Sequence, residues 1–273
     1  MQEGPDLAER SKQIQKLQDN MAAIKHKIVV LSGKGGVGKT TVAVGLTLAL
    51  GRNNKKVGIL DTDIHGPNVA LMLGLEGQQL GGHENTIEPL IAENGIRVIS
   101  MANLLPDSST PVIWRGPAKL GAIRQFLSDT AWGELDCLVI DSPPGTGDEP
   151  LTIAQLIPNM DGAIIVTTPQ DVALLDCRKC VNFARQVDLP IIGIIENMSG
   201  MICPHCGGKI DPFKTGGGKK AADEMNVKFL GSVPMDPVVV EMADRGDLLS
   251  DDQSEVAKAF SSVVGNIVET VGE

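Results

Sequence analysis

The stretch that most constrains the fold lies between a short β-branched run and a long apolar run. It reads Ser32-Gly-Lys-Gly-Gly-Val-Gly-Lys-Thr-Thr41. Gly33 and the segment Gly38-Lys-Thr40 fit the phosphate-loop pattern of a glycine, four residues and then Gly-Lys-Thr. Residues 27–31 before the loop predict a strand, and residues 42–50 after it predict a helix. Strand, loop and helix form the context that this motif requires, and they place the chain among α/β folds.

The glycines let the backbone of this loop curl so that its N–H groups point inward, toward a phosphate group. Lys39 is expected to neutralise the β- and γ-phosphates of a nucleotide, and Thr40 is expected to hold Mg²⁺. The alternative is a glycine-rich turn that binds no ligand. The residues expected to bind the nucleotide are Gly33, Lys34, Gly35, Gly36, Val37, Gly38, Lys39, Thr40 and Thr41.

A second lysine, Lys34, follows the first glycine of the loop. It cannot easily fold back onto phosphates held by its own loop, but it could reach a nucleotide held by another subunit. We therefore expect Lys34 and Lys39 to share in spreading the charge of a transition state for hydrolysis. The alternative is a solvated lysine beside an anion site.

Composition and charge narrow the function classes. The chain has 273 residues, which suits one large α/β domain with small additions. Its formal net charge of −10 argues against non-specific binding to nucleic acid or to anionic membranes. The polar first twenty residues do not resemble a signal peptide, and no apolar stretch is long enough to span a bilayer. We expect a cytoplasmic protein.

Buried strands that alternate with helices predict a doubly wound, mainly parallel sheet with helices on both faces. The apolar spacing within residues 6–25 predicts an amphipathic leader helix. We divide the chain into this leader at residues 1–25 and a P-loop domain at residues 26–273. Residues 75–95 are expected to form a surface excursion. The predicted strands cover residues 27–31, 56–60, 96–101, 136–141, 162–166, 190–195 and 227–231, and a final helix is expected over residues 252–271.

Acidic residues stand where two of these strands end. Asp61 and Asp63 follow one strand, and Asp141 ends another in the manner of a Walker B strand. The carboxyl ends of strands carry the active sites of doubly wound sheets. Asp61 and Asp141 are therefore expected to act on Mg²⁺, directly or through its water, and Asp63 to orient the attacking water. The alternative for Asp61 and Asp63 is an ordinary turn.

Two Cys-x-x-Cys pairs occur in the chain. Cys203 and Cys206 lie in a predicted insertion at about residues 198–216, where Pro204 and Gly207 shape a turn suited to a metal. One pair supplies only two of four ligands, so a symmetric dimer would supply the rest. The alternatives are a redox disulfide or loose zinc binding. Cys177 and Cys180 lie within a predicted helix and are expected to be buried structural residues.

Taken together, these motifs resemble the Mrp/ApbC family of P-loop ATPases, which belongs to the deviant Walker A class of MinD and the nitrogenase iron protein. The resemblance covers about residues 25–270. The motifs that carry it, in the order of the family, are Ser32-Gly-Lys-Gly-Gly-Val-Gly-Lys-Thr-Thr41, Asp61-Thr-Asp-Ile-His-Gly-Pro67, Trp114-Arg-Gly-Pro117, Asp141-Ser-Pro-Pro-Gly-Thr-Gly-Asp148, Thr167-Thr-Pro-Gln-Asp171, Glu196-Asn-Met-Ser199 and Cys203-Pro-His-Cys206.

The resemblance implies a homodimer that binds and slowly hydrolyses ATP with Mg²⁺. It implies a [4Fe–4S] cluster held between two Cys203/Cys206 pairs and passed to apo iron–sulfur proteins, with no nucleic-acid or membrane partner. It also implies that Asn197, Pro234 and Asp236 border the adenine. The chain lacks the N-terminal four-cysteine motif of the eukaryotic cytosolic members, so a permanent second cluster is not expected.

Two further functions stay open at this point. One is a positioning ATPase of the MinD or partition type, which cycles on a membrane or on DNA without a metal. The other is a regulatory ATPase in which Cys203 and Cys206 hold Zn²⁺ only to close a dimer. Zinc is also an ion that protein purified in air could hold.

Overall fold

The computed structural model describes residues 7–64, 66–83, 86–104, 116–203 and 205–272, with side chains from residue 11 onward. Four residues of the sequence motifs, His65, Trp114, Arg115 and Pro204, lie outside the described residues.

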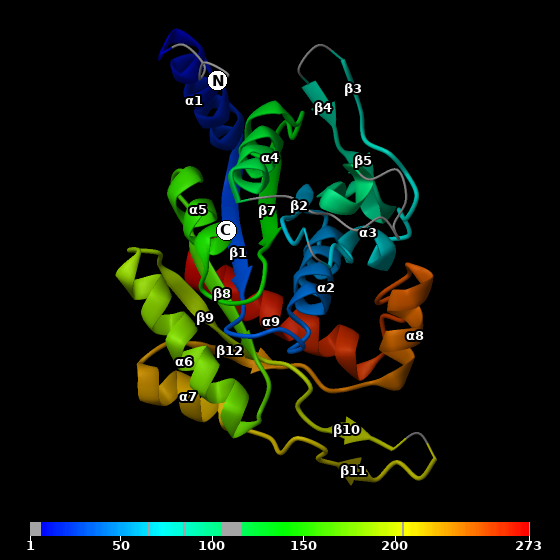
Figure 1. Cartoon of the computed structure of the whole chain (residues 1–273). Coiled ribbons are helices and arrows are strands. Elements are labelled where there is room, and N and C mark those ends of the chain that lie inside the picture. The colour runs from blue at the N-terminus through cyan, green and yellow to red at the C-terminus, as the bar shows by residue number, and fades with distance from the viewer. Residues whose placement is uncertain (1–6, 65, 84–85, 105–115, 204, 273) are drawn as a thin grey trace.

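An eight-stranded sheet forms the centre of the molecule (Figure 1). Its strands are β1 (Ile24–Leu31), β2 (Val57–Asp61), β5 (Leu90–Ile91), β6 (Arg97–Ser100), β7 (Leu135–Asp141), β8 (Gly162–Thr167), β9 (Ile191–Glu196) and β12 (Phe229–Ser232). They lie in the order β12-β9-β8-β1-β7-β2-β6-β5. Every neighbouring pair is parallel except β5 with β6. The expected doubly wound, mainly parallel sheet is confirmed.

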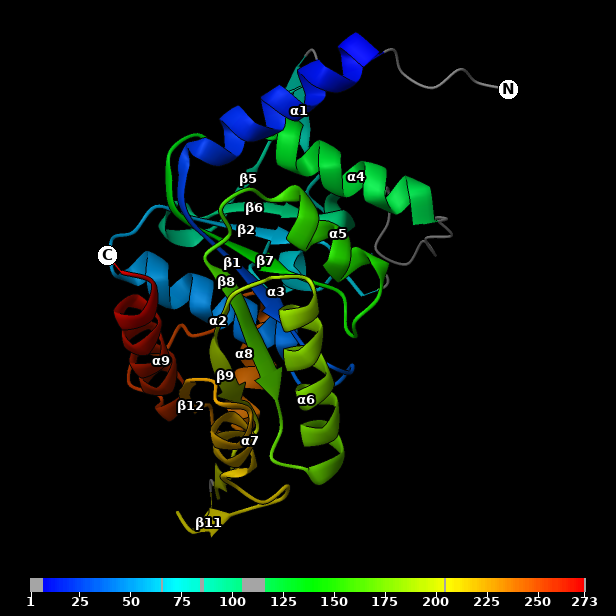
Figure 2. The ribbon, with the colours of Figure 1, turned by 90° about the vertical axis from the view of Figure 1, so that its left-hand side faces the viewer.

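Helices cover both faces of the sheet, as Figure 2 shows with α2 and α9 on one side and α4, α5 and α6 on the other. The α-helices are α1 (Leu7–Ala22), α2 (Lys39–Arg52), α3 (Val69–Met72), α4 (Gly116–Asp129), α5 (Asp148–Leu156), α6 (Asp171–Gln186), α7 (Gly217–Met225), α8 (Pro237–Arg245) and α9 (Glu255–Val271). Short 3-10 helices span Glu93–Gly95 and Met101–Leu104.

The strands are apolar throughout because each of their faces meets a helix layer. Along β1, Ile28 and Val30 join the core under α2 and α9, and Val29 and Leu31 join the core under α4 and α6. All four side chains are buried. A run of β-branched residues without polar alternation is typical of a parallel sheet covered on both faces.

The first helix, α1, lies against α4. Met21 is fully buried in the core, and the Asn20 amide donates to the carbonyl oxygens of Leu127 and Thr130, each at 2.8 Å. Ile14, on the same predicted apolar stripe, is 60% exposed. The second half of the helix is therefore held by the body of the protein.

Several segments differ from their prediction. The leader helix ends at Ala22 and not at residue 25, and the first strand begins at Ile24 and not at residue 27, because Ile24 already pairs with Leu135 of β7. The surface excursion at residues 75–95 contains a hairpin of β3 (Gly81–His83) and β4 (Thr86–Glu88), and it also adds β5 to the main sheet, antiparallel to β6. The final helix starts at Glu255 and not at residue 252, because the Ser254 hydroxyl accepts a hydrogen bond from the Ala257 N–H at 3.1 Å and caps it there.

The topology brings distant residues to one edge of the sheet. β1, β2, β7 and β9 are parallel, so the loops that follow them all lie at the carboxyl edge. The strand register pairs Asp61 with Asp141 and Val30 with Asp141. The phosphate loop, the acids and the segment after Glu196 therefore share this edge.

Candidate functional site

The phosphate loop joins β1 to α2. Gly36 and Gly38 have φ values of +79° and +77°, a left-handed conformation that glycine adopts without strain. A side chain at Gly33 would meet the backbone oxygen of Asp176 on α6 at 2.2 Å, whereas a side chain at Gly35 would meet nothing within 4 Å. The loop is thus packed against α6 at its start and open to solvent at its tip.

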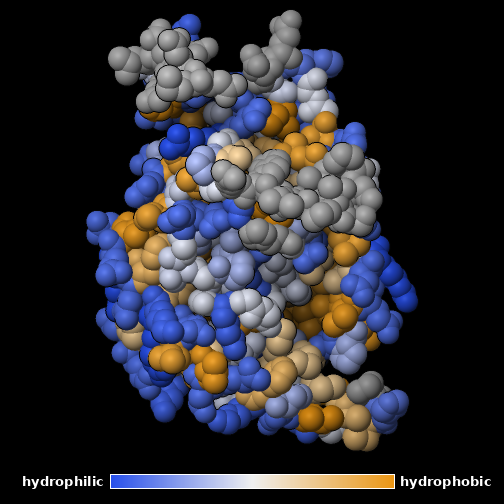
Figure 3. Space-filling view, viewed as in Figure 1, coloured by the Kyte–Doolittle hydropathy of each residue, from blue (hydrophilic) through white to orange (hydrophobic). Residues whose placement is uncertain are grey.

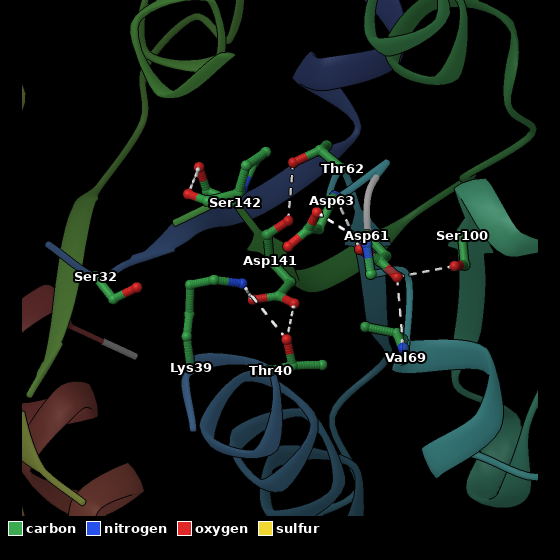
Figure 4. A network of polar contacts seen from close by, with 12 residues as sticks. Ser32, Lys39, Thr40, Asp61, Thr62, Asp63, Val69, Ser100, Asp141 and Ser142 are labelled. Carbon is green, nitrogen blue, oxygen red and sulfur yellow. Dashed lines mark hydrogen bonds and ion pairs between the residues drawn. The ribbon is translucent and has the colours of Figure 1, made fainter. Parts of the chain in front are cut away.

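Lys39 and Thr40 at the start of α2 both contact the Walker B acid (Figure 4). The Lys39 Nζ lies 2.5 Å from one oxygen of Asp141, and the Thr40 hydroxyl donates to the other at 2.7 Å. Lys39 is 6% exposed and Asp141 is fully buried. Burial raises the pKa of Asp141, and the Lys39 ammonium opposes that rise. The arrangement places a cation, a hydroxyl and a carboxylate within one small volume.

Asp61 is buried beside this cluster and holds the loop that follows β2. It accepts hydrogen bonds from the Ser100 hydroxyl at 2.8 Å, the Asp63 N–H at 3.0 Å and the Val69 N–H at 3.4 Å. Burial and then the neighbouring Asp141 carboxylate raise the pKa of Asp61 to about 8. The bonds to residues 63 and 69 fix both ends of the loop that carries Asp63.

Asp63 and Lys34 are the more accessible charged groups of the site. Asp63 is partly exposed, and its carboxylate accepts a bond from the Gly66 N–H at 3.3 Å. Lys34 is also partly exposed, and its carbonyl oxygen accepts a bond from the Ser32 hydroxyl at 3.0 Å. Neither side chain is buried as deeply as that of Lys39.

The segments predicted to border the adenine lie beside one another. The Asn197 amide, just after β9, donates to the Val37 carbonyl oxygen of the phosphate loop at 2.9 Å. Pro234 and Asp236 follow β12. The Ser199 N–H, two residues after Asn197, donates to the Val233 carbonyl oxygen at 3.0 Å and so joins the two segments. Asp236 also caps α8 by accepting from the Val238 N–H at 2.9 Å.

Cys203 and Cys206 lie on a hairpin of β10 (Met201–Ile202) and β11 (Lys209–Ile210) that projects from the lower part of the molecule in Figure 1. Cys206 is exposed and Cys203 is partly exposed. Hydrogen bonds from the backbone N–H groups of His205 and Cys206, and from the Cys206 thiol, lower the pKa of Cys203. The turn therefore favours a thiolate, which is the form that binds a metal.

The hairpin also exposes apolar side chains next to the thiols. Ile202 is 46% exposed and Ile210 is 43% exposed, and Figure 3 shows apolar surface over this hairpin. Within the described part of the chain, no group of three or more His, Cys, Asp or Glu side chains is placed to hold a metal. One chain therefore brings two thiols and an apolar rim to this point.

The other pair, Cys177 and Cys180, is buried on α6. Burial raises the pKa of the Cys177 thiol to about 11 and that of the Cys180 thiol to about 12. Cys137 on β7 is buried as well, and its pKa is raised to about 12. The prediction that Cys177 and Cys180 are buried is confirmed.

The sequence predicted no role for Ser100 or for Glu196, although Glu196 opens one of the motifs that carry the resemblance. Each is the last residue of an apolar strand, at the edge where the site lies. A polar residue that ends an apolar strand at this edge is the signal that could have found them, but only the structure shows which groups each one contacts.

The sequence of this chain is similar to a family model and to proteins of known name. A family model, ParA, described as NUBPL iron-transfer P-loop NTPase, matches residues 23–268. A protein of Methanocaldococcus jannaschii named "Iron-sulfur cluster carrier protein" is 55% identical over 94% of this chain and 88% of that protein. A protein of Saccharolobus solfataricus with the same name is 47% identical over 97% of this chain and 92% of its own length.

Solved structures agree with the fold. A nucleotide-binding protein from Archaeoglobus fulgidus in complex with ADP has a TM-score of 0.79 and 35% identity, covering 90% of this chain and 96% of that one. The cell division ATPase MinD of Pyrococcus furiosus has a TM-score of 0.67 and 25% identity, covering 89% of this chain and 98% of that one. No helix among the described residues is long and apolar enough to cross a membrane.

Proposed function

This chain belongs to the ParA family of NUBPL iron-transfer P-loop NTPases, and from that premise we propose that it is an ATP-dependent carrier of iron–sulfur clusters. The observation that carries the proposal is that one chain holds both a phosphate loop and a pair of accessible thiols. Only a short segment separates Asn197, which contacts the loop, from Cys203 on the hairpin. A phosphate loop with its lysine, threonine and acid lies on one side, and a hairpin with two accessible thiols lies on the other. The names of the relatives, and the ADP bound to the Archaeoglobus protein, support the same function.

The nucleotide would bind with its phosphates in the loop from Gly33 to Thr41. Lys39 would exchange its contact with Asp141 for the β- and γ-phosphates. Asn197, Pro234 and Asp236 would border the adenine, because Asn197 already contacts the loop and residues 233–235 lie beside residues 199–200.

The residues around Lys39 fit a magnesium ion. The Thr40 hydroxyl and the Asp141 carboxylate lie 2.7 Å apart, and both are oxygen ligands of the kind that Mg²⁺ prefers. Thr40 and Asp141 would hold the ion, and Asp61 would act on its bound water. When bound, the ion neutralises charge on the phosphate oxygens.

Hydrolysis would proceed by in-line attack of water on the γ-phosphate, with no covalent intermediate. Asp63 would orient the water, from the loop that Asp61 fixes. Lys39, and Lys34 from a second copy of the chain, would stabilise the charge of the transition state. Turnover would be slow, because the reaction serves to change the state of a dimer.

The cargo would be a [4Fe–4S] cluster held by Cys203 and Cys206 of two copies and delivered to apo iron–sulfur proteins. One hairpin offers two thiols, and such a cluster takes four. The exposed Ile202 and Ile210 beside the thiols are suited to a contact between two proteins.

The test is anaerobic reconstitution followed by transfer to an apo-enzyme, with and without ATP. Wild-type protein should bind one cluster per dimer and activate the apo-enzyme. The double variant Cys203→Ala/Cys206→Ala should bind none. The matched control is Cys177→Ala/Cys180→Ala, which should keep the cluster.

Two results would contradict the proposal: a cluster retained without Cys203 and Cys206, or a monomer in solution with both ATP and cluster present. Lys39→Ala should abolish the effect of ATP on transfer. Zinc in place of iron after anaerobic purification would favour the zinc-bridged regulatory ATPase.

The similarity to MinD supports a second candidate, a positioning ATPase. Co-sedimentation with liposomes or DNA separates it from the carrier. With a formal net charge of −10, the chain should stay in the supernatant in both assays.

A further inference from the structure

The segment that carries the thiols begins and ends at one buried carboxylate. Glu196, the last residue of β9, is fully buried. One of its oxygens accepts from the Ser199 hydroxyl at 2.5 Å and from the Gly216 N–H at 2.9 Å, and the other accepts from the Gly218 N–H at 2.5 Å. Ser199 lies where the chain leaves for the hairpin, and the two glycines lie where it returns to α7.

A buried carboxylate is stable only when hydrogen bonds replace the water that it has lost. Here all three donors come from the two ends of one excursion, so the charge of Glu196 holds those ends together. The approach is close: a side chain at Gly218 would lie 2.8 Å from the Glu196 Cβ, and Gly216 has a left-handed φ of +79°. The backbone at this point is therefore shaped around the carboxylate.

The next residue contacts the nucleotide site. Asn197 donates to the Val37 carbonyl at 2.9 Å, and a side chain at Gly38 would meet its amide nitrogen at 2.2 Å. Successive side chains along a strand point to opposite faces of the sheet. Accordingly, Ile194 joins the core on the α6 side and Ile195 joins the core on the α2 side.

Residues 196 and 197 continue this alternation, with Glu196 toward α7 and Asn197 toward the phosphate loop. The backbone around them is held on both sides: the Asn197 N–H donates to the backbone carbonyl oxygen of Thr167 at 2.8 Å, and the Val233 N–H donates to the backbone carbonyl oxygen of Glu196 at 2.8 Å. A shift of Val37 or Gly38 would therefore move Asn197 and the adjacent Glu196, and with Glu196 the two ends of the hairpin segment.

We propose that Glu196 is a positioning residue that couples the phosphate loop to the geometry of Cys203 and Cys206. The inference rests on the proposed function, since it gives that function a route between its two sites. When a nucleotide orders the loop, the contact with Val37 fixes the position of Asn197 and so of the adjacent Glu196. The hydrogen bonds of Glu196 to Ser199, Gly216 and Gly218 then fix both ends of the hairpin segment.

The test compares the alkylation rates of Cys203 and Cys206, measured by mass spectrometry on metal-free protein, with and without a non-hydrolysable ATP analogue and Mg²⁺. In wild-type protein the nucleotide should slow alkylation about five-fold or more, the lower end of typical couplings between sites. In Glu196→Gln the two rates should differ by less than about two-fold, because an amide has one oxygen and would turn its NH₂ toward a backbone N–H.

Nucleotide affinity separates coupling from a merely structural role. Glu196→Gln should bind the analogue with an affinity within about three-fold of wild type, because Glu196 touches no part of the phosphate loop. The matched control is Asp171→Asn. Asp171, at the start of α6, forms an exposed ion pair at 2.8 Å with Lys214 of the hairpin segment, and the loss of this pair should leave the wild-type rate ratio unchanged.

If Glu196→Gln does not fold, Ser199→Ala removes one of the three bonds and should lower the rate ratio part of the way. The inference is overturned if Glu196→Gln keeps the wild-type ratio, or if nucleotide leaves alkylation unchanged in wild-type protein. No cluster takes part in this assay, so either result leaves the carrier function standing. That function fails only in the reconstitution and transfer experiment.

Discussion

The two Cys-x-x-Cys pairs of this chain have the same spacing and opposite surroundings. Cys177 and Cys180 lie one helical turn apart on α6, at 1% and 0% exposure, among the side chains that cover the sheet. Cys203 and Cys206 lie in the turn of a projecting hairpin, one partly exposed and the other exposed. The spacing alone does not make a metal site. The surroundings decide whether a thiol can ionise and be reached.

Electrostatics sharpens this contrast. Burial raises the pKa of Cys177 and Cys180, whereas backbone N–H groups lower the pKa of Cys203. A metal or an alkylating reagent reacts with the thiolate. The buried pair is therefore protected both by its neighbours and by its protonation.

The largest expected difference between the pairs is in reactivity. At pH 7.5, a pKa of about 11 to 12 means that at most about one molecule in 3,000 carries a thiolate at Cys177 or at Cys180. Iodoacetamide should label Cys203 and Cys206 in the native protein and leave the other pair unlabelled, with a rate ratio above about 1,000. Mass spectrometry of the labelled peptides measures it. All four should react in 8 M urea, and native labelling of Cys180 at a comparable rate would contradict the contrast.

The next effect is on stability. Cys180→Ser should lower the free energy of unfolding by about 1–3 kcal/mol, because it places a hydroxyl in a fully buried apolar position. Cys177→Ser should cost less, since the Thr167 hydroxyl lies near enough to oppose the rise in the Cys177 pKa and can accept a hydrogen bond from a serine there. Cys203→Ser should change the value by less than about 0.5 kcal/mol. Urea unfolding followed by circular dichroism tests the order, and a cost for Cys203→Ser equal to that for Cys180→Ser would break it.

The smallest effect is a shift in the pH dependence of labelling at Cys203. Hydrogen bonds to its thiolate lower its pKa, so the thiolate persists to lower pH than in an ordinary exposed thiol. The rate should therefore fall at a lower pH in the native protein than at the same residue in urea. The measurement is the labelling rate from pH 6 to pH 10. A native midpoint at or above the unfolded one would show that the turn does not stabilise the thiolate.

Much of the fold could be predicted because its signals are local. The β-branched run before Ser32 and the apolar run after Thr40 predicted strand and helix around the phosphate loop, and both are present as β1 and α2. The start of the last helix was missed by three residues, because Ser254 caps it and Asp252 does not. The strand β5 was missed because two residues carry too little pattern and depend on β6 as a partner.

The candidate site, too, contains residues that a local motif predicts and contacts that only the structure shows. The sequence predicted Thr40, Asp61 and Asp141 around one Mg²⁺ and Lys39 on the phosphates beside it, since the loop and the Walker B strand each have a recognisable pattern. The structure brings Lys39 and Thr40 into contact with Asp141, and the roles assigned to these three residues and to Asp61, Asp63 and Lys34 remain predictions. The contacts of Ser100 with Asp61 and of Glu196 with Gly218 were not predictable, because the partners are 39 and 22 residues apart and no motif joins them.

By itself, then, the sequence determined the elements, their alternation and the identity of the phosphate loop, because helix and strand periodicity and turn chemistry act over a few neighbouring residues. Only the tertiary structure decided how far each thiol is exposed and which carboxylate holds the two ends of the hairpin segment together. Burial and hydrogen bonding between distant residues exist only once the strands have paired, and these are the interactions that set a thiol's pKa and hold a buried charge.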